Sequence, residues 1–326
     1  ALDLHKEYGG ILDMYQNGQE SVPVRAFFGD LLDRPRSRRA VPLTLLDRQV
    51  NLDQLLAVDH AMKYPVSYVQ GPPGTGKTTT IINTIITAFY NEKTVSFTAY
   101  NNHPIDSVME KLTAMTYGSE RIPFPVIRLG NSEKVLESLA SVRRLYKRYR
   151  TMQVFDKTLS RNRNRQTQAR KQLSELLRRY EEQLEMKERE ETITRLLEYE
   201  QKNSHSMGML PFEADLRGRQ LAQVSRRIRK LGEVTDEEAL GLLADDGENL
   251  RHYLFYTSVR YIKKIDSPGH ERFREILYMD EPEQQLAQFH KYLSDGENLK
   301  AFLEIFPVVA TTCISAHRLG DPAVHF

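Results

Sequence analysis

The stretch that decides the fold is YVQGPPGTGKTTTIINTI, residues 68–85. Within it, GPPGTGKT at residues 71–78, here called the glycine loop, matches the G-x-x-x-x-G-K-[ST] pattern of a phosphate-binding loop. An apolar run, PVSYVQ, precedes the loop, and residues with helical spacing follow it in TTTIINTIITAFY. A loop motif that lies between an expected strand and an expected helix is much stronger evidence of phosphate binding than a glycine-rich turn alone. We therefore expect the glycine loop to bind the phosphates of a nucleotide.

The residue types of the glycine loop each have a chemical role. The glycines let backbone N–H groups converge on phosphate oxygens, and the helix N-terminus behind them favours negative charge. Lys77 is expected to contact the β- and γ-phosphates. The Thr78 hydroxyl is expected to bind Mg²⁺, a cation that prefers oxygen ligands. Lys77 and Thr78 are therefore the predicted catalytic residues, and Thr78 is the predicted metal ligand.

The composition narrows the class of protein. The chain has 326 residues, a formal net charge of +2 and 40% hydrophobic residues, enough for a sizeable core. Its single cysteine, Cys313, excludes an internal disulfide and suits a reducing cytoplasm. No apolar run approaches the roughly 20 residues of a membrane span, so we expect a cytoplasmic protein without a membrane partner. Because the chain starts without Met and stops after a motif-like run, we also expect a fragment.

Hydrophobic periodicity divides the chain into three parts. Residues 1–50 form an N-terminal segment, and residues 51–130 alternate strand and helix, which is typical of a parallel α/β sheet. Residues 131–300 are helical and highly charged, before residues 301–326 return to a strand pattern. The predicted fold is an α/β P-loop NTPase whose parallel sheet is interrupted by a long, mainly helical insertion. The expected strands are residues 65–70, 93–99, 124–130 and 306–312, and the expected helices are residues 78–90 and 104–112.

Three segments around the glycine loop narrow the function. In VNLDQLLAVDHAM, Gln54 carries an amide with both a donor and an acceptor for an adenine edge. FTAYNNHPIDSVMEKL begins in the second expected strand, and IRLGNSEKV lies further downstream. A further segment, FPVVATTCISAHRLG, contains the last expected strand. With the glycine loop, these segments resemble the nucleotide-binding half of superfamily 1 helicases, in the nonsense-mediated-decay-helicase-like, 5′-to-3′ branch. The resemblance covers residues 50–130 and 306–320.

The resemblance implies a RecA-like first motor domain that binds ATP and Mg²⁺ and acts on single-stranded DNA or RNA. It also implies that Gln54 recognises adenine. The predicted ATP-binding residues are Gln54, Gly71, Pro72, Pro73, Gly74, Thr75, Gly76, Lys77, Thr78 and Thr79. The nucleic-acid-binding residues that the matching motifs imply are Thr98, Asn101, Asn102, Asp106, Thr311 and Thr312. Taken singly, Gln54 also fits a surface helix, and the two asparagines also fit a turn.

Hydrolysis requires an acidic residue to hold the metal ion and a carboxylate to orient water. The resemblance places an Asp-Glu pair on the strand after TTCISA, where this chain ends. Asp280 and Glu281 in EILYMDEPEQQ have a similar form, but the apolar residues before them have helical spacing. We therefore expect these two acids at a solvated helix end. The true acidic motif and a second RecA-like domain are expected in the rest of the same parent chain, so the fragment should bind ATP weakly and hydrolyse it poorly.

The helical insertion gives a second functional clue. Apolar residues recur in steps of four and three in ARKQLSELLRRYEEQL and LAQVSRRIRKL, which predicts a coiled-coil-like hairpin that reverses at residues 203–212. A basic block with interleaved Tyr146, Tyr149 and Phe155 precedes it. The block fits nucleic-acid phosphates and bases, or else a solvated helix face whose tyrosines pack inward. Its nucleic-acid-binding candidates are Arg143, Arg144, Lys147 and Arg148, and the arginine-rich loop at residues 34–39 is weaker evidence of the same kind.

Two hypotheses of different class remain. The favoured one is the first motor domain of an ATP-dependent helicase or translocase, in which the glycine loop holds ATP and the downstream motifs and basic block hold the nucleic acid. The alternative is a P-loop ATPase, or an ATP switch, whose coiled coil serves as a scaffold. The alternative is weakened because such scaffold ATPases usually have an asparagine in the loop and a serine-glycine-rich signature, and neither occurs here.

Overall fold

The computed structural model describes residues 4–28, 41–46, 48–154, 167–203, 211–243 and 247–319. Its centre is a parallel three-stranded sheet in the order β1-β5-β4. These strands are β1 (Val95–Ala99), β4 (Val126–Arg128) and β5 (Val308–Thr312). The last strand in the described part of the chain, β5, therefore lies between two strands that precede it by more than 170 residues. The parallel α/β sheet predicted from the sequence is confirmed.

Helices cover both faces of this sheet because neighbouring strand residues point to opposite sides. Val126 and Val308 belong to a core with α4 (Lys77–Tyr90), α5 (Asn102–Thr113) and α11 (Gly247–Lys263). Ile127 and Val309, the next residues along these strands, belong to a second core. Its helices are α6 (Ser132–Tyr149), α12 (Glu271–Leu277), α13 (Pro282–Leu293) and α14 (Gly296–Ile305). Much of the predicted insertion thus packs directly on the sheet.

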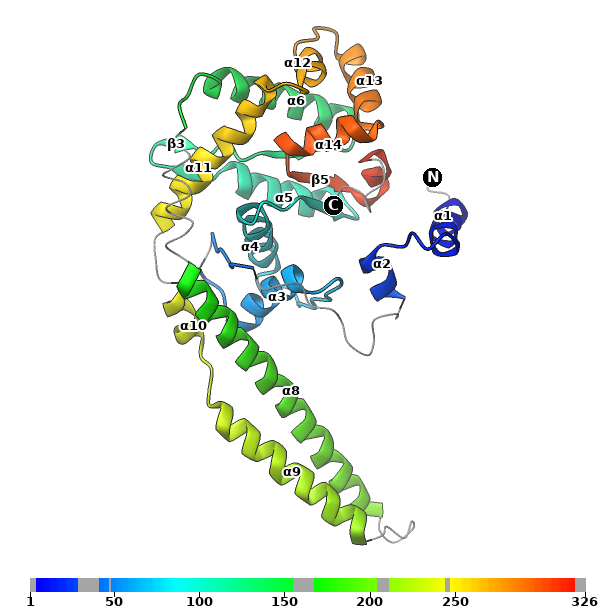
Figure 1. Cartoon of the computed structure of the whole chain (residues 1–326), viewed down its shortest axis with the longest axis vertical. Helices are drawn as coiled ribbons and strands as arrows, with labels where there is room; N and C mark the ends of the chain where they lie inside the picture. Colours follow the sequence, from blue (N-terminus) through cyan, green and yellow to red (C-terminus); the bar gives the residue numbers. More distant parts are fainter. Residues whose placement is uncertain are drawn as a thin grey trace.

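The remaining part of the insertion leaves the sheet as a helical hairpin. It consists of α8 (Thr167–Asn203), α9 (Pro211–Leu231) and the short α10 (Asp236–Leu242). Figure 1 shows α8 and α9 running side by side away from the sheet. The predicted reversal at residues 203–212 agrees with the ends of the two helices, although residues 204–210 lie outside the described residues.

The base of the hairpin packs on a third core. Its helix α3 (Leu52–Lys63) contributes Leu52, Leu55 and Leu56, and α8 contributes Leu173, Leu176 and Leu177. Leu173 and Leu177 were placed in the seam of the predicted coil, but they are fully buried in this shared core. The base of α8 is therefore joined to α3 through apolar packing.

One expected strand is absent. Residues 65–70 are assigned no strand, and Val66, Tyr68 and Val69 are 46%, 87% and 52% exposed. A strand forms only when a neighbour pairs with its N–H and C=O groups, and nothing in the described part of the chain pairs with this segment. The prediction of a strand directly before the glycine loop was therefore wrong for this structure.

The N-terminal segment contains two helices, α1 (Leu4–Gln16) and α2 (Val22–Phe27). A two-stranded antiparallel hairpin precedes β4 and consists of β2 (Thr116–Tyr117) and β3 (Glu120–Arg121). The described residues also form the 3₁₀ helices η1 (Lys264–Asp266) and η2 (Cys313–Leu319). Across the described ranges, no helix has the length and apolar character needed to cross a membrane.

Candidate functional site

The glycine loop leads directly into α4, the helix expected after it. Gly76 caps α4 with a left-handed φ of 76°. A Cβ at Gly76 would lie 2.5 Å from Gln54 Nε2, and a Cβ at Gly71 would lie 2.7 Å from Thr75 Oγ1. Position 76 therefore favours glycine because of its positive φ, and at both positions a Cβ would have to displace a neighbouring side chain. This close backbone approach is the kind of cradle that phosphate binding requires.

Lys77 closes the loop on itself. Its Nζ donates to the carbonyl oxygens of Gly71 and Pro72 at 2.5 and 2.6 Å. The Thr75 hydroxyl also donates to the Pro72 carbonyl, at 2.8 Å. The Lys77 side chain is exposed, so its ammonium can exchange these neutral carbonyls for phosphate oxygens. Thr78 lies half-buried in the first turn of α4, beside this cation.

Gln54 connects α3 to the glycine loop. Its Nε2 donates to the Thr75 carbonyl at 2.8 Å, and its Oε1 accepts from the Asn51 backbone N–H at 3.2 Å. The Asn51 side chain accepts from the Gln54 N–H at 2.9 Å, which completes a capping box at the start of α3. Each amide atom of Gln54 has a second hydrogen-bonding position left for a base edge. The structure thus brings Gln54 and the loop into one site.

A cavity of about 550 Å³ opens beside these residues. Gln54 and Lys77 line it together with the apolar side chains of Val69, Ile81 and Phe97. It separates the unpaired segment 65–70 from β1, whose other edge is paired with β5. Its size and mainly apolar lining with a few polar groups are typical of ligand sites.

The helicase-like motifs gather at the carboxyl ends of the strands. Thr98 lies opposite Thr311 in the β1–β5 pairing, and Asn101 caps α5 directly after β1. Thr98 is exposed, whereas Thr311 is fully buried, and the Thr312 hydroxyl donates to Ser315 Oγ at 3.2 Å. Of the two matching threonines on β5, therefore, Thr311 is closed to a ligand in this structure.

Arg128 joins two of the predicted nucleic-acid residues. It lies on β4, is 6% exposed, donates to Asn102 Oδ1 at 2.9 Å and forms an ion pair with Asp106. Burial lowers the pKa of the Arg128 guanidinium, while Glu137 opposes that shift. Sequence reasoning missed Arg128, although a charged residue inside the apolar run FPVIRLG was a signal, because buried charges need partners.

The basic block lies elsewhere. Arg143 stacks over the Tyr278 ring at 4.7 Å, Arg148 forms an ion pair with Glu120 on β3, and Arg144 and Lys147 are exposed. The block is at the end of α6, next to the two-stranded β2–β3 hairpin, whereas the asparagine motif follows β1. Since the strands are parallel, the structure does not bring the two sets together.

The two tyrosines of the block do not face solvent. Tyr146 is 3% exposed and bonds Asp266, and Tyr149 is 5% exposed and donates to the Arg121 carbonyl at 3.3 Å. The idea that these tyrosines stack on bases is therefore wrong for this structure, because they pack into the core. Phe155, and the arginines of residues 34–39, lie outside the described residues.

Asp280 and Glu281 lie at an exposed helix end. Glu281 caps α13, whose first residue is Pro282, and Asp280 lies between α12 and α13. Figure 1 shows these helices well away from α3. No group of three or more His, Cys, Asp or Glu side chains within the ranges that the structure describes could hold a metal ion. Thr78 stays the predicted Mg²⁺ ligand, and the described residues add no carboxylate cluster beside it.

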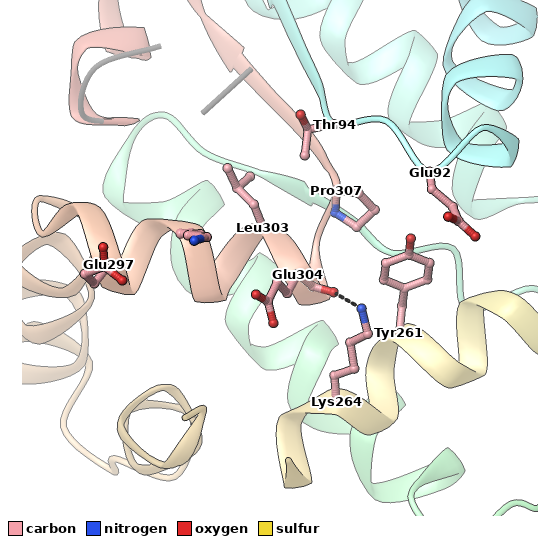
Figure 2. Close-up of a pocket in the computed structure, with 9 residues that line it drawn as sticks. Glu92, Thr94, Tyr261, Lys264, Glu297, Leu303, Glu304 and Pro307 are labelled. Atoms are coloured by element: carbon pink, nitrogen blue, oxygen red, sulfur yellow. Dashed lines mark hydrogen bonds between the residues drawn. The ribbon is translucent and has the colours of Figure 1, made fainter. Parts of the chain in front are cut away.

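A second cavity, of about 510 Å³, lies at the opposite, amino-terminal edge of the strands (Figure 2). Thr94 and Pro307, which precede β1 and β5, line it. Lys264 Nζ donates to the Glu304 carbonyl at 3.0 Å and lies 4.4 Å from the Tyr261 ring centre. Burial lowers the pKa of Lys264, while Glu304 opposes the shift. The cavity contains none of the predicted site residues.

Comparison with known proteins gives a family and two kinds of relative. Residues 49–319 match a family of AAA domains. The DNA-binding protein SMUBP-2 of Rattus norvegicus is 30% identical over 129 residues, which are 39% of this chain and 12% of that protein. The regulator of nonsense transcripts 1 homolog of Drosophila melanogaster is 32% identical over 106 residues, 32% of this chain and 8% of that protein. The matched segment is thus a small part of either relative. No solved structure matches the chain.

Proposed function

The chain belongs to the family of AAA domains that its residues 49–319 match, and from this premise we propose that it is the ATP-binding first motor domain of an ATP-dependent nucleic-acid helicase or translocase. The resemblance to superfamily 1 helicases of the nonsense-mediated-decay branch is confirmed by its two kinds of relative. The observation that carries the proposal is the hydrogen bond from Gln54 to the Thr75 carbonyl. It places an amide that can read a base against a loop that can hold phosphates.

ATP and Mg²⁺ are the ligands proposed for this site. The glycine loop would hold the phosphates through its N–H groups and Lys77, and Gln54 would recognise adenine. Thr78 would ligate Mg²⁺, which neutralises charge that develops on the phosphates. The tight contacts at Gly71 and Gly76 support this fit, because a side chain at either position would fill the cradle.

Single-stranded DNA or RNA is the proposed partner. Thr98, Asn101, Asn102 and Asp106 lie at or after the carboxyl end of β1, on the same edge of the sheet as Thr312. Arg128 holds Asn102 through a hydrogen bond and Asp106 through an ion pair. Ligands of open parallel sheets bind at this edge. Arg143, Arg144, Lys147 and Arg148 stay candidates for a separate contact to phosphates.

The remaining catalytic acids are proposed to come from another part of the parent protein. Among the residues that the structure describes, β1 has one edge without a paired strand, and the exposed apolar segment 65–70 faces that edge across the cavity. An unpaired edge and an unpaired apolar segment on either side of one space favour further strands between them. We propose that such strands carry the acidic pair and that a second RecA-like domain completes the site, so the chain alone hydrolyses ATP poorly.

The alternative function is supported by one observation, the length of the hairpin. With 37 residues, α8 is about 55 Å long at 1.5 Å per residue, longer than packing on α3 requires. A scaffold ATPase would use that length to bind a partner protein. In that case nucleic acid would leave ATP turnover unchanged.

The experiment that tests the function is ATP turnover by the intact parent protein, with and without single-stranded DNA and single-stranded RNA. We expect at least one of the two to raise turnover by about tenfold, which is within the usual range of coupling between two ligands. The control is Asn101→Ala, which removes a predicted nucleic-acid residue outside the nucleotide cavity. Stimulation by neither nucleic acid would exclude the motor function and leave the scaffold.

A further inference from the structure

The strongest unexplained feature outside the nucleotide site is the polar contact between α3 and the hairpin base. The Tyr180 hydroxyl of α8 donates to Asp53 Oδ1 at 2.7 Å, and Asp53 is the neighbour of Gln54. At the other end of α3, the hydroxyl of its C-cap residue, Tyr64, donates to Glu181 Oε1 at 3.2 Å. His60 Nε2 lies 2.9 Å from the same Glu181 oxygen. Two consecutive residues of α8 thus hold the two ends of α3.

The third helix of the hairpin base also contacts the start of α3. Asp236 Oδ1 accepts from the Leu52 backbone N–H at 2.7 Å, and Leu52 is one of the first-turn residues of α3. α10 is in turn fixed to α8, because Arg179 Nη2 lies 2.9 Å from both carboxylate oxygens of Glu238. These bonds surround the apolar core in which Leu55 and Leu56 pack against Leu177.

The nucleotide contact comes from the residue next to Asp53, and both residues line the cavity of about 550 Å³. Gln54 bonds the glycine loop, and its neighbour Asp53 bonds Tyr180, so adjacent residues of one helix address the loop and the hairpin. A short helix moves as a rigid unit, and misplacing a recognition group by about 1 Å is costly to binding and catalysis. Any shift of α3 against α8 therefore changes where the Gln54 amide meets its ligand.

We propose that Tyr180 and Glu181 are positioning residues for nucleotide recognition, because they set α3, and with it Gln54, against the glycine loop. This inference rests on the proposed function, in which Gln54 recognises adenine. It gives the part of the hairpin that packs on α3 a role in the selection of adenine over guanine. Simple attachment of the hairpin to the sheet domain would not require such a role. Burial and the bond to Asp53 raise the pKa of Tyr180 to about 12, so its hydroxyl remains a donor at neutral pH.

The test compares the affinities of the 326-residue chain for ATP·Mg²⁺ and GTP·Mg²⁺ by calorimetry. The variant is Tyr180→Phe with Glu181→Gln, which removes the Tyr180 hydroxyl donor and the Glu181 charge but keeps the ring and the side-chain lengths. We expect the preference for ATP over GTP to fall about fivefold, the lower end of typical coupling between sites. The matched control is Glu175→Gln on the same helix, whose ion pair is with Arg178 of α8 itself, and its preference should equal that of the wild type.

A second arm shows whether the effect passes through Gln54. In a Gln54→Ala background, the Tyr180→Phe and Glu181→Gln changes should have no further effect on the ATP preference, because their target is gone. An unchanged preference in the double variant, with ATP binding intact, would overturn the inference and leave the proposed function standing. A loss of affinity for both nucleotides alike would show a general structural effect and would also overturn it. Failure of the wild-type chain to bind ATP would contradict both proposals.

Discussion

Gly76 is the residue at which the two halves of the candidate nucleotide site meet. Its φ of 76° turns the chain into α4. The Gln54 amide lies next to the position that a Cβ of residue 76 would take. The loop motif requires a glycine here to bind phosphate, but the structure adds a second reason. A side chain at position 76 would have to push the Gln54 amide away from the loop.

Gly76→Ala is therefore expected to be costly in two ways. A non-glycine residue in the left-handed region costs about 1–2 kcal/mol, so the free energy of unfolding should fall by about that amount. The new Cβ would lie 2.5 Å from Gln54 Nε2, so the amide must move and ATP affinity should fall as well. Urea unfolding and ATP titration measure the two effects.

Gly218→Ala is the matched control for that change. Gly218 lies in α9, and a Cβ built on it meets nothing within 4 Å. The same substitution should there raise the free energy of unfolding by about 0.5–1 kcal/mol, because glycine is a poor helix former. Equal stability and equal ATP affinity of Gly76→Ala and the wild type would contradict the described geometry.

At the scale of the element, α3 is the helix on which the account depends. It packs on the hairpin base through Leu52, Leu55 and Leu56, and it meets the glycine loop through Gln54. Leu177 of α8 is fully buried in this contact, whereas Leu196 of the same helix is 45% exposed. Substitution of each leucine therefore distinguishes the effect of the α3–α8 contact on stability from the effect of a change in α8 alone.

Leu177→Ala should lower the free energy of unfolding by about 2–5 kcal/mol, the usual cost of removing a buried leucine and leaving a cavity. Leu196→Ala should change it by no more than about 0.5 kcal/mol, because surface substitutions have small effects. Helix propensity cancels in this comparison, since both changes are leucine to alanine within α8. Chemical denaturation measures both variants, and equal losses would show that the α3–α8 core does not anchor the hairpin.

Sequence patterns predicted the elements whose signals are local. The helix at residues 78–90 and the strands at 93–99, 124–130 and 306–312 agree with α4, β1, β4 and β5, because each has a clear period and clear ends. The segment 65–70 has the same apolar character, yet it is not a strand, because strand formation depends on a neighbour that local sequence does not specify. Local sequence likewise does not specify that the leucines near the start of α8 pack against α3.

Long-range polar contacts were the least predictable part of the candidate site. The glycine loop and Gln54 were identified from spacing, and the structure places them in contact. Arg128, Tyr180 and Glu181 were not identified, because their partners lie far away in the sequence. The basic block was identified by its charge, but its tyrosines face inward, as the period of α6 requires.

At the scale of the whole molecule, the candidate nucleotide cavity lies where three parts of the chain meet. The sheet supplies β1, the glycine loop supplies the proposed phosphate cradle, and α3 supplies Gln54 while it packs on the hairpin base. Figure 1 shows the hairpin projecting from this junction on the side away from α12 and α13. A ligand on the hairpin and a nucleotide in the cavity would thus act on the same helix.

Calorimetric titration of the 326-residue chain with ATP·Mg²⁺, beside Lys77→Ala and Lys111→Ala, tests the central claim most directly. Lys77 is the cation of the loop, whereas Lys111 is an exposed cation of α5, so both variants lose the same charge. Hydrogen bonds to charged groups contribute about 1.5–3 kcal/mol, so Lys77→Ala should weaken ATP binding by about 10- to 100-fold. Lys111→Ala should bind as the wild type does. Equal affinities for all three proteins, or no binding by the wild type, would contradict a nucleotide site at the glycine loop.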